Sequence, residues 1–205
     1  MSLALWSLIV WSSVLFLFPP TVGILLRFDR PPSEAFVKQL RREVEYIFEP
    51  SGLLLRWETV RRRTPGVYDR ILIVQMRGNC SSQFSVDLGP PEPGLALGRT
   101  VVNDGEVIPF SIVDCDQVAR VVAHAARSLP ARLLVSNMYA RLAGRVLVHE
   151  MLHALLGSTG HDPAGFARSP IQAGDLTTMP RLTPAQLTAL QRLGRPTPGV
   201  SVANK

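Results

Sequence analysis

Three of the four histidines of this chain lie close together, between positions 149 and 161. His149 and His153 belong to the pattern HExxH, and His161 follows eight residues later. Histidines four residues apart lie one above the other on a helix face, so their ring nitrogens can share one Zn²⁺. Glu150, next to the first histidine, can reach a water bound to that metal. These residues predict a metal centre with a catalytic carboxylate beside it.

The histidine motif lies in an apolar segment, which predicts a buried helix from about 133 to 156 that ends at Gly157. Burying two histidines and a carboxylate costs several kcal/mol unless these groups are satisfied, and a metal ion would satisfy them. The alternative is a pair of ordinary core histidines bonded to carbonyl groups, which leaves Glu150 without a role. The apolar residues around the motif are Val146, Leu147, Met151, Leu152, Ala154, Leu155 and Leu156.

The composition is that of one globular domain with a sizeable core. The chain has 205 residues, of which 46% are hydrophobic and 19% are charged. Its net charge is +6, but the arginines are scattered apart from the run Arg61-Arg62-Arg63. No basic helix is interleaved with aromatic residues, so no nucleic-acid partner is expected.

Residues 1–23 are expected to be a signal peptide or an N-terminal membrane anchor, separate from the fold. Residues 3–18 form an apolar run, which Pro19-Pro20 ends. The run is short for a membrane span and slightly long for a signal-peptide core. The small residues Thr21-Val22-Gly23 lie near a plausible cleavage point. The protein is therefore predicted to be exported (secreted, periplasmic or at the cell surface). If the leader is retained, residues 3–18 would anchor the protein in the membrane, and no other part of the chain is expected to contact it.

The chain has two cysteines, Cys80 and Cys115. In an exported protein they are expected to form one disulfide. Closing a loop of this size contributes about 3–4 kcal/mol. In a cytosolic protein they would instead be two buried thiols.

Hydrophobic periodicity predicts a mixed order of strands and helices. The segment 33–48 is a predicted helix with apolar residues on one face and its Arg, Lys and Glu residues on the other. Strands precede and follow this helix, and a crossover of this length implies a parallel pair. Ser33, Asp114 or Asp116, and Thr183 are the expected N-caps of three helices. The predicted strands are 23–28, 53–60 and 70–76, the hairpin arms are 95–102 and 107–113, and the other helices are 114–128 and 183–194.

One arm of the predicted hairpin is expected to form the outer strand of the sheet. An exposed edge strand beside a metal-binding helix could hold an extended polypeptide substrate by main-chain pairing. A structural hairpin with no ligand is the alternative.

This order of elements, with HExxH, Gly157 and His161, resembles the metzincin zinc peptidases, and the closing helix resembles that of the matrixins. The resemblance implies a mixed α/β (α+β) fold. A twisted, mostly parallel sheet with an antiparallel edge strand would be packed by the N-terminal helix and the metal-binding helix, with a small C-terminal helical subdomain. It implies a single catalytic domain over 24–205, with an upper part 24–157 and a lower part 158–195. By the same resemblance, His149, His153 and His161 would bind Zn²⁺, and Glu150 would be the general base of an endopeptidase.

The chain departs from the family pattern HExxHxxGxxH in two ways. Gly157 is four residues after His153 and His161 is eight after it, so the turn is two residues longer, and Asp162 is the first substitute ligand to test. The family also has a methionine turn, but no Met occurs six to eight residues after His161. Either Met179 serves after a longer loop, or Phe166 or Ala167 forms the floor of the site.

Two rival hypotheses remain. A gluzincin takes its third ligand from a downstream Glu, but no Glu follows Glu150, which leaves Asp162 or Asp175 as a third ligand. The other rival is a non-catalytic exported domain whose structural metal site supports partner binding. The lengthened turn after His153 and the missing methionine turn motivate that hypothesis, although structural zinc sites normally have four protein ligands and no Cys lies nearby.

Overall fold

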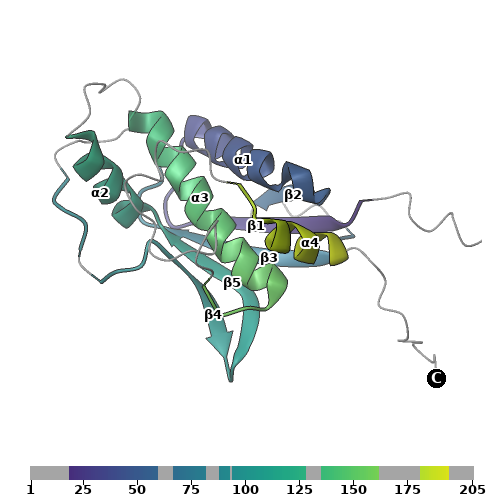
Figure 1. The fold of residues 1–205 in the computed structure, drawn as a ribbon. Helices are drawn as coiled ribbons and strands as arrows, with labels where there is room; N and C mark the ends of the chain where they lie inside the picture. The colour runs from purple at the N-terminus through teal and green to yellow at the C-terminus, as the bar shows by residue number, and fades with distance from the viewer. Residues whose placement is uncertain are drawn as a thin grey trace, which may run out of the picture.

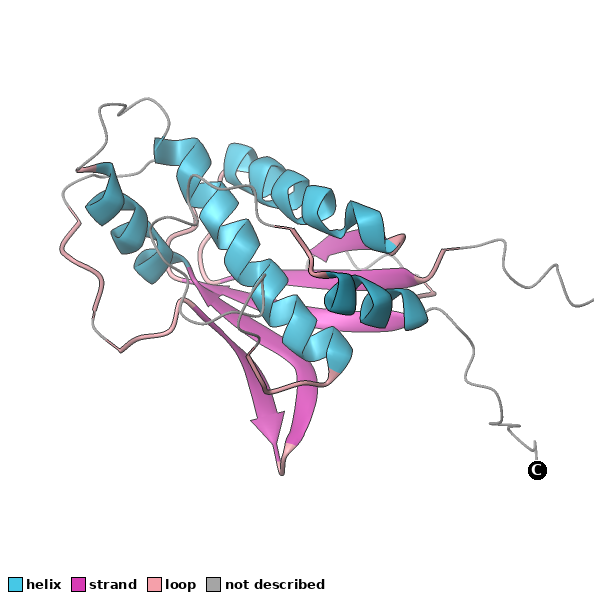
Figure 2. Ribbon diagram, in the orientation of Figure 1, coloured by secondary structure: helices cyan, strands magenta, loops and turns pink. Residues whose placement is uncertain are grey.

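The computed structural model describes residues 19–59, 67–81, 88–92, 94–127, 135–161 and 181–193. These residues form a five-stranded sheet and four α-helices, in agreement with the mixed α/β class expected from the sequence. Helices α1, α3 and α4 lie on one face of the sheet, and α2 lies at one end (Figure 1, Figure 2). The elements are β1 (Thr21–Phe28), α1 (Glu34–Phe48), η3 (Glu49–Ser51), β2 (Leu54–Thr59), β3 (Arg70–Arg77), β4 (Gly98–Asn103), β5 (Glu106–Asp114), α2 (Cys115–Ala126), α3 (Val135–Leu156) and α4 (Pro184–Arg192).

The sheet has the strand order β2-β1-β3-β5-β4. The pairs β1–β2, β1–β3 and β3–β5 are parallel, whereas β4 pairs antiparallel to β5 at the edge. This confirms the predicted sheet with its antiparallel edge strand. Strand β1 begins at Thr21, two residues before the predicted start, and Val22 is buried. The sheet therefore includes Thr21, Val22 and Gly23, although the sequence predicts them as part of the leader.

The core lies between the helix-covered face of the sheet and the apolar faces of α1 and α3. Alternate residues of a strand point to the same face, so every second residue of β1 and β3 enters this core. Leu190 of α4 is also fully buried in it, so the last helix packs onto the same core. The buried strand residues are Val22, Ile24, Leu26, Leu72, Val74 and Met76, and the helix residues packed over them include Phe36, Leu40, Val44, Leu147 and Met151.

The helix starts agree with the predicted capping residues. The Ser33 side chain accepts a hydrogen bond from the Phe36 N–H, and the Asp114 carboxylate accepts one from the Gln117 N–H. Thr183 forms a full capping box at the start of α4. Each cap satisfies backbone donors that have no partner inside the helix, which fixes where the helix begins.

The prediction that all charged residues of α1 face solvent is wrong for Glu43, which is buried. The guanidinium Nε atoms of Arg145 and Arg141, both on α3, donate to its two carboxylate oxygens at 2.7 and 2.9 Å. Gly144 allows this close approach, since a Cβ there would lie 3.1 Å from the Glu43 Cβ. A carboxylate can face a helix interface when guanidinium groups satisfy it, which periodicity alone does not reveal.

The predicted disulfide between Cys80 and Cys115 is confirmed. Both residues are fully buried, with their Cα atoms 5.4 Å apart. Cys80 follows β3 and Cys115 begins α2, so the bond ties the end of a central strand to the start of that helix. The β4–β5 hairpin lies in the loop that the disulfide closes.

None of the helices in the described residues is long and apolar enough to cross a membrane. The apolar run 3–18 and the basic turn 61–63 lie outside the described residues.

Glu43→Gln is expected to lower the free energy of unfolding by about 3–5 kcal/mol, because it leaves the buried Arg145 without its charge partner. Urea denaturation followed by circular dichroism would measure the change. Arg42→Gln, at the adjacent exposed position of α1, is the matched control and should change stability by less than about 0.5 kcal/mol. Equal effects of the two substitutions would contradict a structural role for the ion pair.

Candidate metal centre

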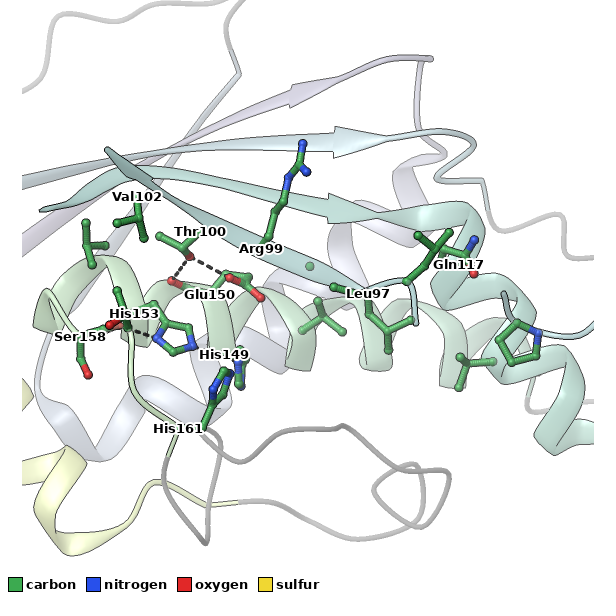
Figure 3. Close-up of a pocket in the computed structure, with 18 residues that line it drawn as sticks. Leu97, Arg99, Thr100, Val102, Gln117, His149, Glu150, His153, Ser158 and His161 are labelled. Carbon is green, nitrogen blue, oxygen red and sulfur yellow. Dashed lines mark hydrogen bonds between the residues drawn. The ribbon is translucent and has the colours of Figure 1, made fainter. Parts of the chain in front are cut away.

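His149, His153 and His161 come together at the C-terminal end of α3 (Figure 3). One ring nitrogen from each lies within 4.8 Å of the others. His149 and His153 are buried on the helix, whereas His161 is exposed and reaches the pair from the segment that follows α3. The structure thus brings together the three histidines that the sequence singled out.

A turn at Gly157 directs the chain back toward the helix. Gly157 has a φ of 62°, a left-handed conformation that glycine adopts without steric cost. The Ser158 N–H donates to the His153 carbonyl at 3.2 Å, which closes the end of α3. The turn that is two residues longer than the metzincin pattern therefore still delivers His161 to the pair on the helix.

The ring orientation of His153 leaves one nitrogen available to a metal. Its Nδ1 lies 2.6 Å from the Ser158 carbonyl oxygen. A carbonyl can only accept a hydrogen bond, so Nδ1 carries the proton, and the lone pair of the neutral ring is on Nε2, which lies 3.1 Å from the His149 Nε2. A backbone carbonyl on the second ring nitrogen is the usual way in which a metal-binding histidine is oriented.

The donor set fits a tetrahedral metal such as Zn²⁺. The Nε2 atoms of His149 and His153 are 3.1 Å apart. Two nitrogens bound to zinc at about 2.0–2.1 Å in tetrahedral geometry would be separated by about 3.3 Å. The His161 ring lies with its centroid 5.2 Å from that of His149 and 5.0 Å from that of His153. Three imidazoles leave a fourth coordination position open, which is the arrangement of catalytic zinc sites.

Glu150 is buried and is held by Thr100 of β4. The Thr100 hydroxyl lies 2.8 Å from the Glu150 Oε2 and 3.0 Å from the Glu150 carbonyl oxygen. The Ser111 hydroxyl lies 3.0 Å from the Thr100 hydroxyl. Burial raises the pKa of Glu150 to about 7, and the hydrogen bond from Thr100 opposes this rise. Strand β4 therefore fixes the carboxylate next to the three histidines.

Gly98 allows β4 to approach α3 closely. A Cβ at this position would lie 2.7 Å from Val146 Cγ1 and 2.9 Å from Glu150 Oε1. Both distances are shorter than van der Waals contact, so any side chain here would push the strand away from the helix. The close contact brings the Thr100 hydroxyl within reach of Glu150.

The histidines and Glu150 line a cleft of about 450 Å³ between β4 and α3. The edge strand β4 forms one wall, and the residues after α3 close one end. Figure 3 shows Thr100 directed toward Glu150 and Arg99 directed away from it. Apart from the polar groups already described, the lining is mostly apolar and includes Pro91, Leu95, Leu97, Val102, Val107, Val121 and Val146.

Several residues that the sequence suggested are not part of the described site. Asp162, Phe166, Ala167, Asp175 and Met179 lie outside the described residues. His124 is exposed on α2, away from the cluster, and its Nδ1 accepts a hydrogen bond from Arg127 at 2.7 Å.

Three residues of the site are not predicted from the sequence: Thr100, Gly98 and Ser158. Thr100 and Gly98 have the same strand parity, which could have placed them on one face of the predicted hairpin arm. Nothing in the sequence links that face to Glu150, fifty residues further along the chain. Ser158 acts through its backbone carbonyl, so its residue type carries no signal.

Comparisons with solved structures give a structural likeness, whereas those with family models and curated proteins do not. No family model and no curated protein matches the chain. Among solved structures, archaemetzincin from Methanopyrus kandleri aligns with 16% sequence identity and a TM-score of 0.47, covering 85% of this chain and 94% of that chain. A likeness at this level carries no inference about function, so the site rests on its own side chains.

Zinc content provides a direct test of the ligand set. The purified full chain is expected to bind about one Zn²⁺, because three histidines form one site. His149→Ala, His153→Ala and His161→Ala should each lower zinc affinity by at least about tenfold, whereas His124→Ala should retain it. Elemental analysis and competition with a zinc chelator would measure this. Full zinc retention in His161→Ala together with loss in Asp162→Ala would assign the third ligand to Asp162.

Proposed function

We propose that this protein is a zinc-dependent endopeptidase that hydrolyses polypeptides bound along β4. The observation that carries the proposal is the presence in one cleft of three converging histidines and a buried carboxylate. A structural metal site would need no carboxylate beside it and would normally have four protein ligands. The further expectation that the protein acts outside the cytoplasm is supported by its disulfide.

His149, His153 and His161 would hold the metal, and neutral imidazoles do so without cancelling its charge. Zn²⁺ bound there would lower the pKa of a water molecule and polarise the carbonyl of the scissile peptide bond. The hydrogen bond from His153 to the Ser158 carbonyl keeps this ligand in one tautomer and one orientation.

Glu150 would act as the general base. Its carboxylate accepts a proton from the attacking water and returns the proton to the amine that leaves, so the same group serves both halves of the reaction. Thr100 is a positioning residue, since its hydroxyl holds one carboxylate oxygen at 2.8 Å and leaves the other to receive the proton. Burial disfavours the charged form of Glu150, and the Thr100 hydroxyl opposes this by donating a hydrogen bond to that form.

A polypeptide substrate would lie along β4. Within the described residues, β4 is an outermost strand of the sheet and pairs with β5 on one side only. Residues of β4 also line the cleft. An extended peptide can add to such an edge by main-chain hydrogen bonds, which places its carbonyl groups near the metal centre without requiring one particular sequence. The register of β4 against β5 shifts between Thr100 and Val102, and this irregularity limits the length of uniform edge.

Glu150→Gln is expected to reduce the rate of hydrolysis of an unfolded protein by about a hundredfold to ten-thousandfold, the usual contribution of a general base. Zinc content should stay unchanged, because the histidines are intact. Glu106→Gln, at an exposed position of the hairpin, is the matched control and should keep full activity. Equal hydrolysis by the wild type and Glu150→Gln would refute the peptidase proposal and favour the non-catalytic domain with a structural metal.

Thr100→Val removes the hydroxyl but keeps the shape of the side chain. We expect kcat to fall about tenfold or more, because a hydrogen bond to a charged group is worth about 1.5–3 kcal/mol. KM and zinc content should change little, since Thr100 contacts Glu150 and none of the metal-binding groups. Thr100→Ser should restore most of the rate. Loss of stability without any fall in kcat would show that Thr100 has only a packing role.

A further inference from the structure

The cleft continues from the metal centre to a second helix, α2. Gln117 and Val121 are one turn apart on α2, so they lie on one face of that helix, and both line the cleft. Val146, one turn before His149 on α3, also lines it. Figure 3 shows Gln117 toward the opposite end of the cleft from Ser158. We call this end of the cleft the α2 subsite: Pro91, Leu95, Leu97, Gln117, Val121 and Val146.

Hydrogen bonds hold the residues before β4 against the start of α2. The Glu92 N–H donates to the Gln117 Oε1 at 3.3 Å, and the Asp114 N–H donates to the Leu97 carbonyl at 2.8 Å. Arg120 adds an ion pair with Glu92 at 3.8 Å. This wall of the cleft is therefore tied near both of its ends, so the subsite is formed without a ligand.

Gln117 is the polar group of the α2 subsite, and its amide has only donors left to offer. The side chain is 5% exposed, and its Oε1 already accepts the Glu92 N–H. That bond fixes which end of the amide is oxygen, so the other end carries two N–H donors. Among the residues that the structure describes, no acceptor bonds to its Nε2. A buried donor without a partner is costly, so a molecule in the cleft that supplies an acceptor is favoured here.

The other side chains of the α2 subsite are apolar. Leu95 is 54% exposed, and Val121 is half-buried. Beside the subsite, Glu92 pairs with Arg120, and Arg99 is directed to the other side of β4 (Figure 3). A charged side chain placed in the subsite would lose water without gaining a partner, whereas a large aliphatic or aromatic side chain would bury apolar surface.

We propose that the α2 subsite binds a large apolar side chain of the polypeptide substrate, and that Gln117 donates a hydrogen bond to a main-chain carbonyl next to that side chain. The inference rests on the proposed function, which places an extended polypeptide along β4. In an extended chain alternate side chains point to the same face, and a pocket beside the strand selects one of them. Gln117 is then a substrate-binding residue, and Leu95 and Val121 determine specificity.

The side-chain amide of Gln117 reports directly on binding. The full chain, labelled with nitrogen-15, would be titrated with N-acetyl-leucine methylamide, which carries an apolar side chain and main-chain carbonyl groups, and followed by nuclear magnetic resonance. Gln117→Leu identifies the side-chain amide resonances of Gln117, since they disappear in that variant. We expect these resonances to shift several-fold more with this probe than with N-acetyl-glycine methylamide, the matched control without a side chain. Equal shifts with both probes, or no shift with either, would overturn the proposal.

The positions at which the protein cleaves test the specificity. Reduced casein would be digested, and its products identified by mass spectrometry. The wild type should favour Leu, Ile, Met or Phe at one fixed position relative to the cleaved bond. Leu95→Asp should lower this preference about tenfold or more and raise cleavage at sites with Lys or Arg there, because one methylene in an apolar pocket already changes discrimination by that amount. Tyr46→Asp on α1 is the matched control and should keep the wild-type profile, since Tyr46 is 49% exposed and Leu95 54%.

Two results of the digestion would overturn the proposal: an unchanged apolar preference in Leu95→Asp, or no preference at any position in the wild type. Absence of cleavage by the wild type would instead refute the proposed function. The shifts of the Gln117 resonances then decide the subsite alone, because they require neither the metal nor catalysis.

Discussion

Helix α3 buries Arg145, His149, Glu150 and His153, and each of these groups gives up water to do so. Arg145 meets Glu43 of α1 on one side of the helix, and Glu150 meets Thr100 of β4 on another. His153 meets the Ser158 carbonyl beyond the C-terminal end. Apolar packing tolerates small rotations of a helix, whereas satisfied buried polar contacts in several directions fix both its rotation and its position along its axis. These contacts therefore fix the positions of the two helix histidines and of Glu150.

The parts of the site differ in how they are positioned. The His149–His153 pair needs only a regular helix, because residues four apart already share a face. His161 needs the turn at Gly157, which is local to the chain. Glu150 instead depends on the distant strand β4, which approaches because Gly98 lacks a side chain. The three histidines are therefore positioned by local structure and Glu150 by tertiary structure.

This difference explains what the sequence could predict. The helices, the strands, the parallel order and three N-caps follow from periodicity and capping residues, which are local properties. Periodicity predicts Glu43 on the solvent side, because it contains no information about Arg145, a partner about a hundred residues further along the chain. Thr100 carries no motif, and its role appears only when β4 lies against α3. Gly157 predicts a turn that could bring His161 to the other two histidines. Only the folded backbone shows that a turn two residues longer than the family pattern still does so.

The disulfide covalently closes the chain segment that contains β4, the strand that forms one wall of the cleft. Cys80 and Cys115 are separated by 35 positions, and the whole β4–β5 hairpin lies between them. A single break of the main chain anywhere in that segment leaves both pieces joined through the sulfur bridge, with β4 still laddered to β5. A nick by a protease in this segment would thus not release the strand that positions Glu150. In a reducing environment the same nick would leave the two pieces held by non-covalent contacts alone.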